Sequence, residues 1–255
     1  DIDLYFGEDG YKKANEIAAT WDEVKFEPDT SYHRAFDYKD VKVENHRIYA
    51  EFYNQRNSRK WEQVKEYISL LNGEKFIVEE KEIDVPSPQM NAIYIFMHLM
   101  HHFLNVGVGF RQICDWLCLL HAKKEVIDMD IFERSIHDLP IKRGMAAVKY
   151  IAVKYMGFPD GDMIPLEITS NQIKHDGEMM LKDILKMGNF AHSTIMIKNF
   201  DRDNRFLQNL KSYILVLKRF IRIYPICKSE VSAYILSWIH RKFREKCKDS
   251  STLFK

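Results

Sequence analysis

The spacing of apolar residues changes at two prolines, Pro86 and Pro88, and this change constrains the fold more than any other feature of the chain. Before the prolines, several short segments alternate between apolar and polar residues, as strands do. After them, apolar residues recur at helical spacing, and Gly, Pro and Asn mark most of the gaps. The sequence therefore predicts an α+β fold, with a small mixed-sheet unit over residues 1–86 and an all-helical domain over residues 87–255.

The individual elements follow from the same periodicities. In the first part we expect a strand over 1–6, a helix over 11–21 capped by Asp9, strands over 32–38 and 41–52, a helix over 58–71 and one strand over 76–85. The first helix should bury Ala14, Ile17, Ala18 and Trp21. In the second part we expect helices over 89–105, 108–122, 128–138, 141–155, 174–187, 203–223 and 228–247.

The cysteine content and the apolar runs indicate the cellular compartment of the protein. Four cysteines are too few and too unevenly placed for a secreted disulfide framework, which favours a reducing, cytoplasmic setting. No apolar run approaches the length of a membrane-spanning helix, so we expect no membrane partner. The formal net charge is only +1, but acidic residues dominate residues 1–85 and basic residues dominate residues 201–255.

Two carboxylates lie on one face of the expected first strand. Side chains alternate across a strand, so Asp1, Asp3 and Tyr5 point one way while the intervening apolar residues face a core. The Cα atoms of the two acids are about 7 Å apart, by two strand rises. This spacing suits one or two hard cations, which prefer carboxylate oxygens. Surface acids or turn caps are the alternative interpretation of an Asp-x-Asp strand taken alone.

A third acid is available from the expected hairpin. On its second strand, Glu44 and His46 share a face, and if that strand pairs beside the first, Glu44 converges with Asp1 and Asp3. His46 would then support the acids or contact the substrate. His33 and Arg34, on the partner strand, lie within reach of one face or the other, so we treat His46, His33 and Arg34 as candidate nucleotide contacts.

These residues carry a family resemblance. The stretch DIDLYFG at residues 1–7, followed by a helix and then VENHR at residues 43–47, resembles the polymerase β nucleotidyltransferase superfamily, and more closely its uncharacterised bacterial nucleotidyltransferase-like branch. The motifs PSP at 86–88, HLMHH at 98–102 and GFRQICDW at 109–116 resemble the helical signature of that branch. The recognisable motifs extend over about residues 1–121, and the remainder agrees only in being helical.

The resemblance implies a palm in which Asp1, Asp3 and Glu44 are the catalytic acids and also the ligands of a divalent metal, Mg²⁺ or Mn²⁺. It implies transfer of a nucleoside monophosphate from a nucleoside triphosphate to an unknown acceptor, whether small molecule, protein or RNA. The superfamily has a Gly-rich, phosphate-cradling turn upstream of the acid strand, and no residue of this sequence fills that role. We therefore expect an N-terminally truncated palm, with the nucleotidyltransferase activity in the full-length parent.

Two further patterns have competing interpretations. His98, His101 and His102 suggest zinc by their spacing, but helix-packing histidines are favoured because a Cys or acidic partner at matching spacing is lacking. Basic and aromatic residues interleave from Lys211 to Arg244, which suits RNA through phosphate contacts and stacking, or equally an amphipathic helix pair. The alternative function is thus a non-catalytic module that holds a nucleic acid or protein through its basic C-terminal region.

Overall fold

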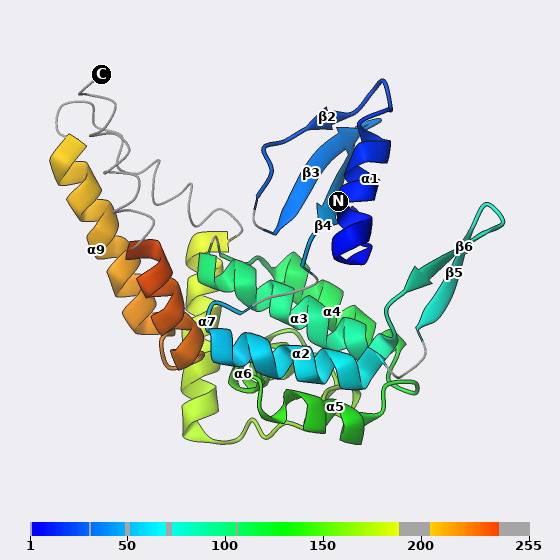
Figure 1. Cartoon of the computed structure of the whole chain (residues 1–255). Coiled ribbons are helices and arrows are strands. Elements are labelled where there is room, and N and C mark those ends of the chain that lie inside the picture. Colours follow the sequence, from blue (N-terminus) through cyan, green and yellow to red (C-terminus); the bar gives the residue numbers. More distant parts are fainter. Residues whose placement is uncertain are drawn as a thin grey trace. The chain divides into compact units, whose positions relative to one another are not determined.

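The computed structural model describes residues 2–30, 32–48, 52–69, 73–105, 107–188 and 205–239. The chain divides into two compact units, Asp1–Glu51 and Phe52–Lys255, and each is described by itself. This division falls earlier in the chain than the domain boundary expected from the sequence, which lies after residue 86. The expected domain boundary stays a prediction. The predicted α+β class is confirmed, because a mixed sheet with helices is followed by further helices (Figure 1).

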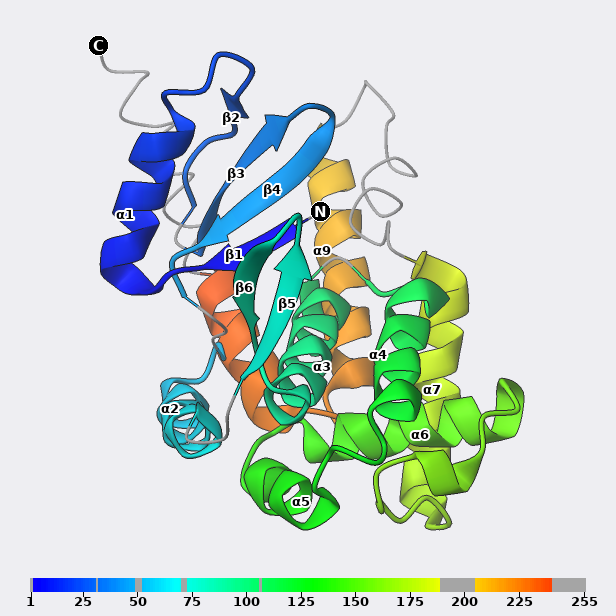
Figure 2. The ribbon, with the colours of Figure 1, turned by 90° about the vertical axis from the view of Figure 1, so that its right-hand side faces the viewer.

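The N-terminal unit is a four-stranded mixed sheet with helix α1 against one face (Figure 2). The strand order is β1-β4-β3-β2, in which β1 is parallel to β4 and the other neighbours are antiparallel. The bounds are β1 Ile2–Tyr5, α1 Gly7–Ala18, β2 Lys25–Phe26, β3 His33–Tyr38 and β4 Val41–His46. The short edge strand β2 has no counterpart among the predicted elements.

Helix α1 begins earlier than predicted. It starts at Gly7, whose φ of +73° is a conformation that glycine adopts without steric cost. The predicted N-cap is therefore wrong, because Asp9 lies inside the first turn. The helix buries Tyr11, Asn15 and Ala18, whereas Ile17 is 48% exposed, so the predicted apolar face is rotated from the observed one.

A small apolar cluster joins α1 to the sheet. Its buried members are Ala18 of α1, Phe36 of β3 and Val43 of β4, and Leu4 of β1 packs against them. Because side chains alternate along a strand, the neighbours of these residues face the opposite side of the sheet. Asn45 of β4 lies on the α1 face and is 1% exposed; its Nδ2 donates to the carbonyl oxygen of Tyr11 at 3.0 Å.

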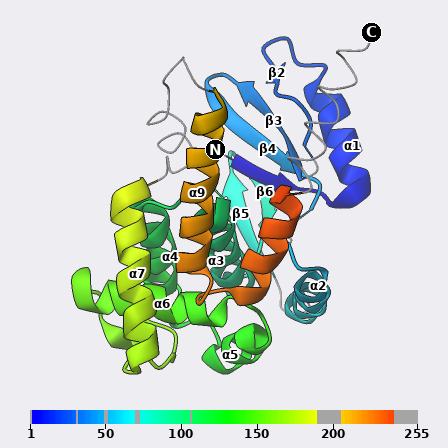
Figure 3. The same ribbon diagram turned by 90° about the vertical axis from the view of Figure 1, so that its left-hand side faces the viewer.

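The second unit consists mainly of helices (Figure 3). Its described elements are α2 Gln55–Ser69, β5 Glu74–Val78, β6 Lys81–Val85, α3 Pro88–Asn105, α4 Phe110–Ala122, α5 Met129–His137, α6 Lys142–Tyr155, the 3₁₀ turn η1 Asp160–Asp162, α7 Asn171–Met187, α9 Arg205–Ile223 and a helical stretch over 228–239. Helix α3 is apolar on nearly every side and contacts α2, α4 and α5, so it is the centre of this unit.

The segment predicted as one strand over 76–85 is a hairpin. Strands β5 and β6 pair antiparallel around Glu79 and Glu80, whose φ values are 45° and 66°. The prediction is wrong because a two-residue turn with positive φ at both positions usually carries Gly or Asn, and this one carries two glutamates. Among the described residues, no helix combines the length and apolar character that crossing a membrane requires.

A buried ion pair connects three helices of the second unit. Arg219 of α9 is 6% exposed and Asp183 of α7 is 1% exposed. The Nε and Nη2 atoms of Arg219 donate to Asp183 Oδ2 at 3.2 and 3.0 Å. The same guanidinium donates to the carbonyl oxygens of Phe103 and Leu104 at the end of α3, where backbone acceptors lack partners within the helix.

Candidate functional site

The face of the sheet opposite α1 carries the candidate site. Strands β1 and β4 run parallel with Asp3 beside Glu44, so the two carboxylates come from neighbouring strands and share this face. On the other side of β4, His33 of β3 is paired with His46. The register therefore gathers Asp3, His33, Glu44 and His46 from three adjacent strands, although 43 residues separate Asp3 from His46 in sequence.

The histidines and carboxylates are in direct contact. His46 Nε2 lies 3.2 Å from Asp3 Oδ1 and 3.5 Å from Glu44 Oε2. His33 Nε2 lies 3.8 Å from the same Glu44 Oε2, and the centroids of the two imidazole rings are 5.2 Å apart. The side chain of His46 is 11% exposed and that of Glu44 19%, whereas His33 and Asp3 are more open at 28% and 40%.

These contacts shift the pKa values of His46 and Glu44. Burial disfavours a charge on His46, but hydrogen bonds to Asp3 and Glu44, with the negative charges of both, outweigh it and raise the pKa of His46 to about 9. For Glu44, the hydrogen bond from His46 outweighs burial and holds the pKa of the carboxyl below its usual value. The site therefore contains an ionised Glu44 at neutral pH.

We expect the His46 imidazole of the metal-free protein to titrate near pH 9, against 6.5 for a free histidine. Since the folded pKa lies above the unfolded one, His46 contributes its full stabilisation below about pH 6.5 and loses it as pH rises through about 9. Imidazole proton resonances, followed by NMR in chelator and assigned with His46→Gln, measure the titration. Asp3→Asn should lower this pKa, and an unchanged value in that variant would contradict the contact.

The donor set fits a divalent cation. Among the described residues, His33, Glu44 and His46 are the group whose ligand atoms all lie within 4.8 Å of one another. Asp3 adds a carboxylate beside it, within contact distance of His46. Carboxylate oxygens and imidazole nitrogens are both established ligands for divalent ions. Asp1, the remaining predicted ligand, lies outside the described residues.

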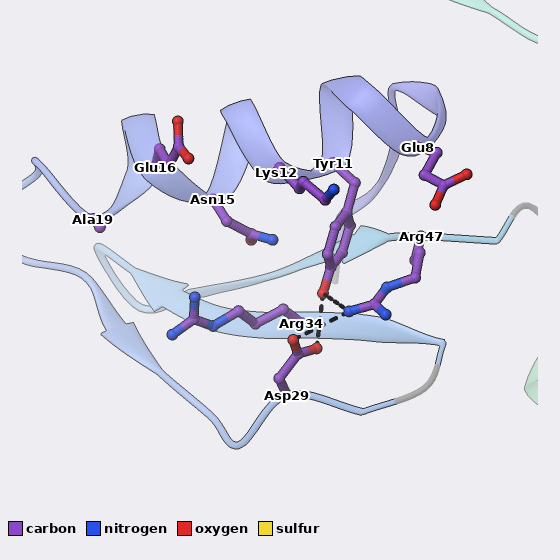
Figure 4. Close-up of a pocket in the computed structure, with 9 residues that line it drawn as sticks. All are labelled: Glu8, Tyr11, Lys12, Asn15, Glu16, Ala19, Asp29, Arg34 and Arg47. Carbon is purple, nitrogen blue, oxygen red and sulfur yellow. Dashed lines mark hydrogen bonds and ion pairs between the residues drawn. The ribbon is translucent and has the colours of Figure 1, made fainter.

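Arg34 does not join this group. It pairs with Asn45 across β3 and β4, which places it on the α1 face, and its guanidinium lies 4.0 Å from the centroid of the Phe26 ring. There it lines a cavity of about 390 Å³ between α1 and the sheet (Figure 4). The other lining residues are Glu8, Tyr11, Lys12, Asn15, Glu16, Ala19, Asp29 and Arg47.

The cavity contains a polar network that sequence reasoning missed. The hydroxyl of Tyr11 donates to Asp29 Oδ1 at 2.7 Å, and Arg47 Nη2 lies 3.3 Å from Asp29 Oδ2 (Figure 4). Arg47 also lies over the Tyr11 ring, 4.7 Å from its centroid. No spacing in the sequence connects Asp29, in the segment before β3, with residues on α1 and beyond β4, so only the folded chain shows this network.

The three histidines of α3, at positions 98, 101 and 102, make ring contacts within the second unit. His98 Nε2 and His102 Nε2 are 2.7 Å apart on α3, and His101 stacks on Tyr53 with ring centroids 5.5 Å apart. Within the described ranges, no Cys or acid completes a metal-sized group with them. This agrees with the packing interpretation. Arg241, Lys242 and Arg244 of the predicted basic region lie outside the described residues.

One comparison with known proteins identifies the family of the chain. Residues 1–157 match a family described as uncharacterised nucleotidyltransferase. Because the match spans more than half of the 255 residues, the chain belongs to this family, and the predicted nucleotidyltransferase resemblance is confirmed. No curated protein and no solved structure matches the chain. The family supports nucleotidyl transfer in general terms, with a nucleotide as the bound partner.

Proposed function

We propose that this protein uses a divalent metal to transfer a nucleoside monophosphate from a nucleoside triphosphate to a hydroxyl-bearing acceptor. The observation that carries the proposal is the register of β1 and β4, which sets Asp3 beside Glu44 on the sheet face opposite α1, with His46 in contact with both. Paired carboxylates supply the oxygen ligands that hold the divalent ions of metal-dependent phosphoryl and nucleotidyl transfer.

We assign the acids to metal binding. Asp3 and Glu44, with Asp1, would hold Mg²⁺ or Mn²⁺, and the ion would supply charge neutralisation at the phosphates. The lowered pKa of Glu44 supports this role because it keeps the carboxyl ionised at neutral pH. In the metal-free protein, His46 bridges Asp3 and Glu44 and so orients both carboxylates.

The main task of the protein in this reaction is to position the nucleoside triphosphate and the acceptor hydroxyl. The acceptor hydroxyl attacks the α-phosphorus and gives its proton to the ionised Glu44, the candidate base. A new phosphate ester bond forms and the bond to pyrophosphate breaks, with no covalent intermediate on the protein. His33 is a candidate nucleotide contact because it borders the acids and is partly open to solvent. Arg34 would contact a nucleotide only from the α1 face, where it lines the cavity.

The proposed setting is cytoplasmic. The low number of cysteines in the sequence is the basis for this setting, and the three cysteines among the described residues, Cys114, Cys118 and Cys227, are free thiols. The proposal specifies the acceptor only by its chemistry, as a molecule that carries a hydroxyl group. The alternative, a non-catalytic module that binds through the basic C-terminal region, stays a prediction. Arg241, Lys242 and Arg244 lie outside the described residues, and within them Arg219 is buried against Asp183.

Calorimetric titration with each nucleoside triphosphate tests the proposal. We expect binding that requires a divalent ion and that weakens at least about tenfold in Asp3→Asn, since the carboxamide supplies no charge to a hard cation. Asp37→Asn is the matched control, because Asp37 lies on β3 on the same sheet face, four residues from His33. Binding that is independent of metal, or equal in Asp3→Asn and wild type, would refute the catalytic site.

A further inference from the structure

We infer that the cation site takes a first-row transition ion in preference to Mg²⁺, with the imidazoles of His33 and His46 as ligands beside the Glu44 carboxylate. The inference deepens the proposed function and depends on the same sheet face. It adds two ligands that an all-carboxylate site would not have, and it names the class of ion. The evidence is the placement of three donor residues on β3 and β4.

The separations between donor atoms suit a shared ion. Two ligand atoms at about 2.1 Å from one ion lie about 3.0 Å apart at a right angle and about 4.2 Å apart when opposite each other. The observed separations are 3.5 Å for His46 Nε2 to Glu44 Oε2 and 3.8 Å for His33 Nε2 to the same oxygen. With the two imidazoles opposite each other and Glu44 at a right angle to both, each of the three separations closes by less than about 1 Å, since every pair in the group lies within 4.8 Å.

The chemistry of the donors selects the ion. Mg²⁺ demands oxygen ligands and gives up water reluctantly, so an imidazole is a poor exchange for one of its waters. Transition ions accept imidazole nitrogen readily, and Mn²⁺ also binds the carboxylates that Mg²⁺ uses. A set of two imidazoles and a carboxylate, with Asp3 adjacent, therefore discriminates against Mg²⁺.

The backbone holds the donors in place while leaving one side open. Hydrogen-bonded strand pairing fixes His33 opposite His46, and Asp3 beside Glu44, without any contribution from the ion. His46 is nearly buried, whereas His33 is 28% exposed, so the group is accessible from the His33 side. A preformed set of this kind loses little conformational entropy when it binds an ion. The ion takes the place of the proton that His46 Nε2 shares with Asp3 and Glu44 in the metal-free protein, and that proton is released on binding.

Electron paramagnetic resonance of Mn²⁺ tests the inference on the whole chain without nucleotide. Bound Mn²⁺ loses the signal of the free ion, and Mg²⁺ is then added as the competitor. We expect the Mn²⁺ dissociation constant to be at least about tenfold below that of Mg²⁺, and nitrogen coupling to appear in the electron spin echo of the bound ion. His33→Ala should raise the Mn²⁺ constant at least about tenfold and weaken the nitrogen coupling.

The His33→Asp variant gives the opposite test, because it exchanges a nitrogen ligand for an oxygen ligand. It should narrow or abolish the preference for Mn²⁺ over Mg²⁺. His137→Asp, an exposed substitution in the second unit, adds the same charge without touching the group and should leave both constants unchanged. Since the His33 side chain is partly exposed and no member of the apolar cluster, neither His33 variant removes core packing.

The outcomes separate this inference from the proposed function. Equal affinity for Mg²⁺ and Mn²⁺, or Mn²⁺ binding without nitrogen coupling, would overturn the inference while leaving metal-dependent nucleotide binding intact. Failure of nucleotide binding with every ion would overturn the proposed function, even if Mn²⁺ binds through His33. Binding of neither ion would overturn both.

Discussion

Glu44→Gln is expected to reduce nucleotidyl transfer at least about 1000-fold, equivalent to about 4 kcal/mol of transition-state stabilisation. Glu44 contacts both His33 and His46, and it is paired in register with Asp3. The carboxamide keeps the shape of the side chain but supplies no negative charge to a cation. Release of pyrophosphate, or transfer of label from the α-phosphate of a nucleoside triphosphate, measures the loss.

Glu27→Gln is the matched control for this prediction. Glu27 forms an exposed ion pair with Lys42 in the same unit, so its substitution removes a charge of the same kind away from the donor group. Circular dichroism should show that both variants keep the sheet. Transfer by Glu44→Gln within tenfold of wild type would show that the Asp3–Glu44 pair is not the catalytic centre.

Arg219→Met is expected to destabilise the second unit by about 3–5 kcal/mol, because it leaves the Asp183 carboxylate buried without its partner. The variant also deprives the carbonyl oxygens of Phe103 and Leu104 of a donor. Methionine keeps most of the side-chain volume, so lost packing contributes little. Chemical denaturation, monitored by tryptophan fluorescence, measures the free energy of unfolding.

Arg222→Met tests whether burial of the ion pair causes the loss of stability expected for Arg219→Met. Arg222 lies on the same helix and approaches the same carboxylate, at 3.6 Å, but it is 38% exposed. A partly exposed pair is screened by water, so the expected loss is no more than about 1 kcal/mol. Equal losses in the two variants would show that the stabilisation does not depend on the buried guanidinium.

The periodicity of the sequence was enough to predict which residues of β1 and β4 share a face. Alternation along the two segments places Asp3 on one side of β1, and Glu44 and His46 on one side of β4, and the structure pairs those sides. The prediction is reliable because Leu4 and Val43 are apolar and pack against α1. The acidic residues next to them in sequence must therefore lie on the opposite face of the sheet. The long helices were predicted for a similar reason, since each carries several turns of regular apolar spacing.

Two features could not be predicted from the sequence: which side chains of β3 face Glu44, and which residues of α1 are buried. His33 and Arg34 are neighbours, so alternation separates them, but only the pairing register shows that His33 is the one beside Glu44. On α1 the buried positions include Asn15, which is 7% exposed, and Tyr11, whose hydroxyl bonds Asp29. Polar atoms satisfied or enclosed by tertiary contacts do not follow an apolar period, so periodicity selected Ile17 instead.

The turn between β3 and β4 consists of Lys39 and Asp40, with φ values of 48° and 63°. Neither side chain belongs to the donor group, yet the length of this turn determines which side of β4 faces His33. A single inserted residue that slipped the pairing by one position would send Glu44 and His46 to the helix side and bring Val43 and Asn45 to the open side. Chemistry at the site therefore constrains the number of residues in this turn more strictly than their identity.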